Sequence, residues 1–64
     1  MDGATRRQKI QEELSLAHRP TSAAALARQL GVSRQIIVGD VALLRAAGAD
    51  ISATPRGYVI LPVA

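Results

Sequence analysis

Three residues, Gly31, Val32 and Ser33, separate two segments that both carry the apolar spacing of a helix. Glycine commonly follows the last residue of a helix, and a serine hydroxyl caps the first turn of the next one. Val32 lies between these two signals and is expected to fill the core between the helices. The sequence therefore predicts two consecutive helices joined by a very tight turn.

A first helix is predicted over residues 4–18. Apolar residues recur at helical spacing at Ile10, Leu14 and Ala17. Thr5 and Gln8 fit a capping box at the start of this helix. Pro20 ends it, because the residue before a proline avoids helical dihedral angles. We expect His18, the chain's only histidine, at the C-terminal end of this helix, where the helix dipole stabilises it.

The second and third helices are predicted over residues 22–30 and 34–47. Thr21 and Ser22 are both good caps for the second helix, and Gly48 follows the third. The buried faces are expected to consist of Ala23, Leu26, Ala27 and Leu30 in the second helix and of Ile37, Val41 and Leu44 in the third. A brief turn with a glycine between two helices is typical of the helix-turn-helix motif.

A β-hairpin is predicted over residues 50–61. Segments 50–53 and 58–61 are rich in strand-forming residues, and Pro55 and Gly57 mark the turn between them, with Arg56 at its tip. Residues 20–22 are placed to add a brief third strand to this hairpin. The predicted fold class is α+β: a winged helix-turn-helix, in which a three-helix bundle is followed by a β-hairpin wing. It forms one domain over residues 1–64.

The composition favours a polyanionic partner. Eight lysines and arginines, seven of them arginines, outnumber five acids, which gives a net charge of +3. The forked donors of arginine suit phosphate and guanine, although a net charge of this size is also ordinary for a small soluble domain. The chain has no cysteine, no signal peptide and no apolar run long enough to cross a bilayer, so we expect a cytoplasmic protein.

The titratable residues do not suggest an enzyme. His18 is the sole imidazole, and the five carboxylates are scattered along the chain. Neither a glycine-rich phosphate loop nor an H-E-x-x-H motif is present in the sequence. We therefore expect no catalytic residues, no metal ligands and no cofactor in this chain.

The outer face of the third helix is the candidate site. Helical spacing places Gln35, Gly39, Ala42 and Ala46 opposite the core, with Val38 at their edge. This surface is shallow and nearly uncharged, which suits the major groove of DNA. Ile36 and Leu43 flank the face, and we expect both to pack in the core, with a thymine contact as the alternative for Ile36. Asp40 is expected to pair with an arginine or to cap a neighbouring backbone group, and not to meet phosphate.

The predicted DNA contacts come from four parts of the chain. Arg34 is a candidate for guanine or phosphate, Gln35 for adenine and Val38 for a thymine methyl. Gly39 permits close approach, or is a neutral substitution. Phosphate contacts are expected at Thr21, Ser22 and Ser33, with Ser33 also a cap, and Arg56 is expected to reach the minor groove or the phosphates. Arg45 is expected to be a flanking phosphate contact or a solvated charge. Arg6, Arg7 and Lys9 form a basic cluster with a weaker claim to the DNA backbone.

These stretches resemble a known family. The segment "VSRQIIVGDVALLRAAG" followed by "ISATPRGYVI" is similar to the amino-terminal domains of the biotin-ligase repressor and of DeoR-type regulators, and most resembles the niacin-responsive repressors. The resemblance implies that Ser33, Arg34, Gln35, Val38, Gly39 and Arg56 face double-stranded DNA. Family members usually carry a second domain that binds nicotinic acid and a metal through histidines. This chain stops at Ala64 and has His18 as its only histidine, so we do not expect it to bind nicotinic acid or the metal.

The resemblance also implies a homodimer on palindromic sites, with the dimer contacts in the domain that this sequence lacks. Two alternatives remain open from the sequence. The domain could instead be a winged-helix module for protein interaction, because a fold does not fix a function. It could also be a regulatory domain detached from a biotin-ligase-like enzyme.

Overall fold

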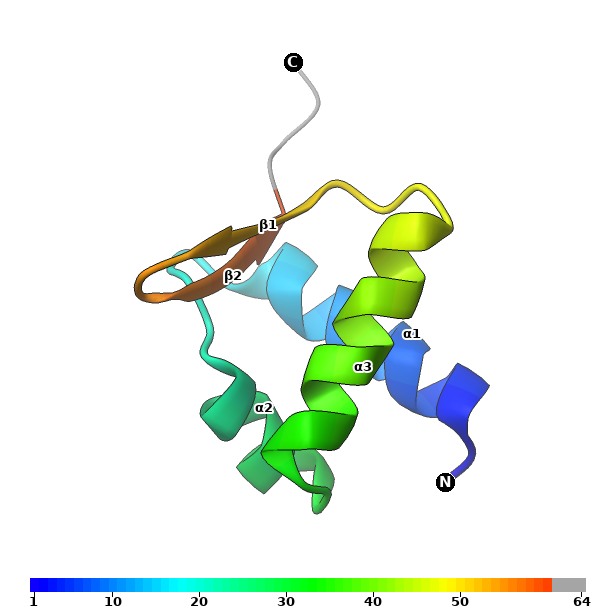
Figure 1. Ribbon diagram of the computed structural model, residues 1–64. Coiled ribbons are helices and arrows are strands. Elements are labelled where there is room, and N and C mark those ends of the chain that lie inside the picture. The colour runs from blue at the N-terminus through cyan, green and yellow to red at the C-terminus, as the bar shows by residue number, and fades with distance from the viewer. Residues whose placement is uncertain (61–64) are drawn as a thin grey trace.

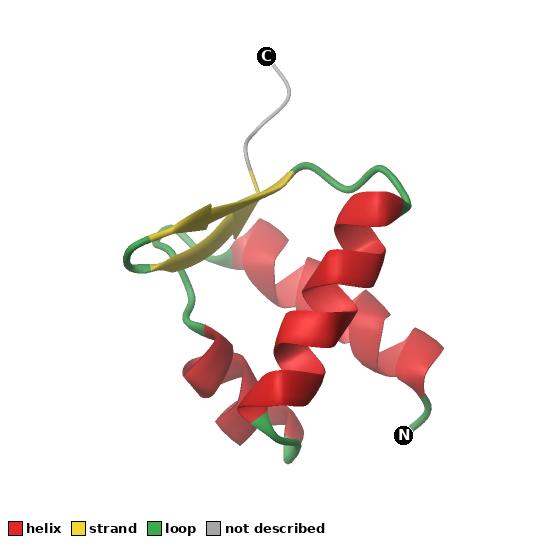
Figure 2. Cartoon of the chain, in the orientation of Figure 1, coloured by secondary structure: helices red, strands yellow, loops and turns green. Residues whose placement is uncertain are grey.

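The computed structural model describes residues 1–60. Its elements, in chain order, are α1 (Gly3–Leu16), α2 (Ala23–Leu30), α3 (Arg34–Ala46), β1 (Ile51–Thr54) and β2 (Gly57–Ile60). Helix α3 crosses in front of α1, α2 lies beside the N-terminal half of α3, and the hairpin covers the opposite end of the bundle (Figures 1 and 2). This arrangement confirms the predicted α+β winged helix-turn-helix fold.

Helix α1 begins and ends at other residues than the sequence predicted. Asp2 is its N-cap, and the carboxylate accepts a hydrogen bond from the Thr5 backbone N–H at 2.8 Å. The capping box of Thr5 and Gln8 is therefore wrong, because Thr5 lies inside the first turn. The helix stops at Leu16 because Ala17 adopts an extended backbone (ψ 137°). His18 lies past the helix, in an exposed bend.

The tight turn between α2 and α3 forms as predicted. Gly31 adopts the left-handed conformation (φ 68°), which glycine tolerates without steric cost. The hydroxyl of Ser22 caps α2 through the Ala25 N–H at 3.0 Å, and that of Ser33 caps α3 through the Ile36 N–H at 3.2 Å. Val32 is half-buried against the core between the two helices.

The hairpin is antiparallel, and Ile51 pairs with Ile60 while Thr54 pairs with Gly57. It gains the expected third partner at Thr21, whose N–H donates to the Tyr58 carbonyl at 3.0 Å and whose carbonyl accepts from the Tyr58 N–H at 2.8 Å. In Figure 1 the segment that leads into α2 runs beside the hairpin accordingly. Leu61, the last residue of the predicted wing, lies outside the described residues.

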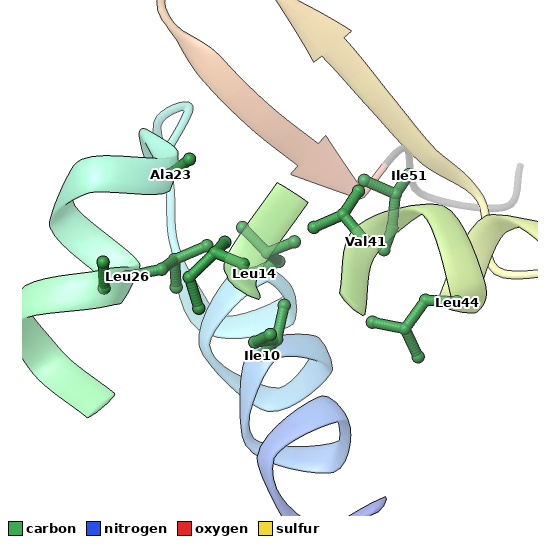
Figure 3. Close-up of a cluster of buried hydrophobic side chains, with 9 residues drawn as sticks. Ile10, Leu14, Ala23, Leu26, Val41, Leu44 and Ile51 are labelled. Carbon is green, nitrogen blue, oxygen red and sulfur yellow. The ribbon is translucent and has the colours of Figure 1, made fainter. Parts of the chain in front are cut away.

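The core lies between the three helices and the start of β1 (Figure 3). Ile10, Leu26, Ile37 and Val41 are almost completely shielded from solvent. The other buried apolar residues are Leu14, Ala23, Ala27, Leu44 and Ile51. Ala17, predicted on the apolar face of the first helix, is exposed because the helix has already ended. Within residues 1–60, no helix combines the length and apolar character needed to span a bilayer.

Candidate nucleic-acid interface

The outer face of α3 is uncovered. Gln35, Gly39, Ala42 and Ala46 are all exposed, and Val38 at the edge of this face is 44% exposed. No other element lies over the front of α3 in Figure 1. A Cβ atom built on Gly39 would find no other heavy atom within 4 Å, so packing inside the chain does not require glycine there. The surface is therefore shallow and open, as the helical spacing predicted.

The N-terminal end of α3 carries two of the predicted contacts. The Ser33 hydroxyl already caps the helix through the Ile36 N–H, so its acceptor role is directed to the protein itself. Arg34 is the first helical residue and is exposed. Two backbone N–H groups in this first turn, those of Arg34 and Gln35, precede the capped one, and they add partial positive charge beside the guanidinium group of Arg34.

A cleft of about 250 Å³ lies between the start of α2, Arg34 and the hairpin turn. Ser22 lines it from α2, and Arg56 and Pro55 line it from the turn. The turn is held by Thr54, whose hydroxyl donates to the Gly57 carbonyl at 2.7 Å and accepts from the Arg56 N–H at 3.1 Å. The cleft thus brings two arginines from separate elements to one place.

Thr21 and Arg45 complete the predicted set. Both backbone polar groups of Thr21 bond to Tyr58, and its side chain is half-buried, so its main observed role is to join the hairpin to α2. Arg45 is exposed in the last turn of α3, eleven residues after Arg34. The two arginines therefore lie near opposite ends of the helix, and its outer face lies between them.

Asp40 is the acid of α3, and it points inward. Its side chain is only 4% exposed. The Arg6 guanidinium donates to both of its carboxylate oxygens through Nε and Nη2, and Arg7 Nη1 lies 3.4 Å from Oδ1. The hydrogen bonds from Arg6 hold the pKa of Asp40 below its ordinary value, against the opposing effect of burial. This confirms the expected arginine partner and assigns Arg6 and Arg7 to an internal ion pair rather than to a free basic cluster.

The prediction that Ile36 and Leu43 pack in the core is wrong. Ile36 is 42% exposed and Leu43 is 56% exposed. The buried residues of α3 are Ile37, Asp40, Val41 and Leu44. Ile36 and Leu43 lie about 100° from the centre of that stripe, and neither α1 nor α2 covers this edge. Their helical angle signalled this position, but their apolar character outweighed it in the prediction.

No three histidine, cysteine or carboxylate side chains come together within residues 1–60 in a way that could hold a metal ion.

A family model described as "HTH domain" matches residues 6–59. The chain belongs to this family of HTH domains. The match runs from the first turns of α1 to the end of the wing, and so includes the whole surface formed by α3, Arg56 and the start of α2.

Two curated relatives are similar to this chain in sequence. A "probable transcription repressor NiaR" from Thermotoga maritima is 55% identical over 47 residues, which cover 73% of this chain and 27% of that protein. The "transcription repressor NadR" of Bacillus subtilis is 40% identical over 62 residues, 97% of this chain and 34% of that protein. The chain thus spans about a third of these relatives or less.

Proposed function

We propose that this HTH domain binds duplex DNA sequence-specifically as part of a transcription repressor. The observation that supports this most is the exposed face of α3, which carries no acid and is flanked by Arg34, Arg45 and Arg56. The helix-turn-helix motif places the N-terminal part of its second helix against base edges in the major groove. A smooth face with cations around it matches the shape and the charge of that groove.

In the proposed complex, Gln35 donates to and accepts from an adenine edge, and Arg34 contacts guanine or a phosphate. Val38 meets a thymine methyl, and Gly39 allows the helix backbone to come close. Arg45 and Ser33 lie at the flanking phosphates.

The hairpin and the start of α2 complete this interface. Arg56 extends from the hairpin to the minor groove or the phosphates, while Thr21 and Ser22 bring the start of α2 to the DNA backbone. The cleft that Arg56 and Arg34 share is the point where a phosphate is held from two sides.

The names of the relatives support a biological setting for this proposal. Both are named as transcription repressors, and the resemblance to niacin-responsive regulators points to control of niacin or NAD metabolism. We propose a cytoplasmic regulator without catalytic activity that works as a homodimer, in which residues 1–64 act as one DNA-binding domain. Since an isolated domain contacts one half-site, its binding is expected to be weak and strongly dependent on salt.

The test is selection of bound sequences from a random duplex pool at low salt, followed by titration of variants on the selected duplex. Gln35→Ala should relax the base preference at one position, by about 1–3 kcal/mol of discrimination. Gln11→Ala, which removes an exposed glutamine of α1, is its matched control and should leave the preference unchanged.

The proposed DNA contact of the hairpin wing is tested by the salt dependence of binding. Arg56→Ala should weaken binding to all duplexes alike and lower the salt slope by about one ion. Arg28→Ala removes one exposed cation from the last turn of α2, outside the proposed contacts, and serves as the charge control that should keep the salt slope of the parent. Binding of all variants equal to that of the parent, or affinity independent of salt, would favour a protein-interaction module over a DNA-binding domain.

A further inference from the structure

Large apolar side chains are exposed on both edges of the α3 outer face. Val38 lies along one edge, and Ile36 and Leu43 lie along the other. Water-exposed aliphatic groups of this size are unfavourable when they gather on one element, and they commonly mark a contact surface. Since these side chains are exposed among the described residues, both edges are accessible to a partner from outside them.

Ile36 and Leu43 are seven residues apart, which is close to two helical turns, so they form a ridge about 10 Å long on the same side of α3. Gln35 and Gly39 lie beside this ridge, in the shallow strip that faces outward. Ile36 belongs to the first turn, next to Gln35, whereas Leu43 lies near the C-terminal end of the helix. Both side chains are thus aliphatic and lie on the same edge of α3, but they belong to different turns of the helix.

The charges of α3 indicate which partner its exposed face suits. Every exposed charged residue on α3 is an arginine, because the carboxylate of Asp40 is buried and neutralised by Arg6 and Arg7. The exposed face of α3 therefore has aliphatic side chains along both edges and arginines as its only exposed charges, both on the edge of Val38, and it suits a partner with a negative periphery and small apolar groups within it. The major groove of DNA has this composition, since thymine presents a C5 methyl group there between two phosphate backbones.

Resting on the proposed function, we propose that Ile36 contacts the C5 methyl of one thymine and so determines sequence beside Gln35. Its position in the first turn is the reason, because the N-terminal residues of the recognition helix reach the base edges. Leu43 lies two turns closer to the C-terminal end of α3, away from the turns that reach the base edges, and we assign it no base contact. Through this apolar contact Ile36 would select thymine, next to the base pair that Gln35 recognises by hydrogen bonds.

The experiment measures the affinity of the chain for its selected duplex with each thymine replaced in turn by deoxyuridine, which deletes only the methyl group. At one thymine, the replacement should weaken binding of the parent about fourfold, as expected for the loss of one buried carbon. In Ile36→Ala the same replacement should change affinity by less than about twofold. Leu43→Ala is the matched control, and it should keep the full fourfold response.

The other results are also decisive. If every thymine responds to deoxyuridine equally in Ile36→Ala and in the parent, the contact proposed for Ile36 is wrong although DNA binding stands. If the response disappears in Leu43→Ala instead, the assignment along the helix is overturned. If selection yields no preferred duplex at all, the proposed function itself fails and this inference with it. Thermal unfolding of both variants checks that neither truncation, at an exposed site, alters the fold.

Discussion

Gly57→Ala should detach the hairpin from α2. A Cβ atom at this position would lie 2.5 Å from the Thr21 carbonyl carbon, 2.6 Å from its oxygen and 2.7 Å from the Ser22 nitrogen. These are backbone atoms, which no side-chain rotation can move away. The hairpin must therefore shift by about 0.9 Å before ordinary van der Waals contact is reached at 3.4 Å.

A shift of that size would lengthen the two Thr21–Tyr58 hydrogen bonds, now 3.0 and 2.8 Å, beyond hydrogen-bonding range. Their loss costs about 1 kcal/mol each, and an alanine forced to a positive φ costs about 1–3 kcal/mol more. The expected decrease in the free energy of unfolding is about 3–5 kcal/mol. This is comparable to the whole net stability of a core of this size, about 3–5 kcal/mol.

Urea unfolding followed by circular dichroism measures this change, with two matched controls. Gly48 also has a positive φ (101°), but a Cβ atom there meets nothing within 4 Å, so Gly48→Ala measures the backbone strain alone. Gly39→Ala lies in a helix with open space around it and should stabilise the fold by about 1 kcal/mol. A loss in Gly57→Ala no larger than that in Gly48→Ala would refute the steric argument.

Asp40→Asn should lower the free energy of unfolding at pH 7 by about 2 kcal/mol, because it leaves Arg6 without its buried counter-charge. Since the folded pKa of Asp40 is depressed below 3.8, its stabilisation is present above about pH 4 and is lost as the pH falls through the folded pKa. Thermal scans across this range should show a weaker acid dependence in the variant, and an unchanged one would contradict the ion pair. Ser33→Ala should cost about 1 kcal/mol through the lost cap, whereas Ser15→Ala, at an exposed serine inside α1, should cost almost nothing in the same assay. Leu26→Ala should cost about 2–5 kcal/mol and leave little folded protein in calorimetry, and a well-folded variant would show that this side chain does not support the core.

Local signals in the sequence were sufficient for most of the fold. Gly31 and Ser33 each have one strong conformational preference, so the turn between α2 and α3 was predictable from three residues. The start of α1 was not, because Asp2 and Thr5 are both good caps and lie three residues apart. Its early end at Leu16 was missed because no glycine or proline lies between Leu16 and Pro20.

The candidate site was predictable where it depends on a single helix. The angle between successive residues places Gln35 and Gly39 outward whatever surrounds α3. Contacts between distant segments were harder to foresee. The sequence indicated an arginine or a backbone group as the partner of Asp40, but not that Arg6 and Arg7 of α1 would supply the charge. The cleft that joins Arg34 to Arg56 arises only once the hairpin is seated.

The pairing of Thr21 with Tyr58 has a consequence for the thermodynamics of association. Because main-chain bonds tie the wing to the segment entering α2, the loop bearing Arg56 loses most of its conformational entropy during folding. A duplex that engages this loop then meets a preorganised main chain, and the ordering cost of binding is confined mostly to exposed side chains such as that of Arg56.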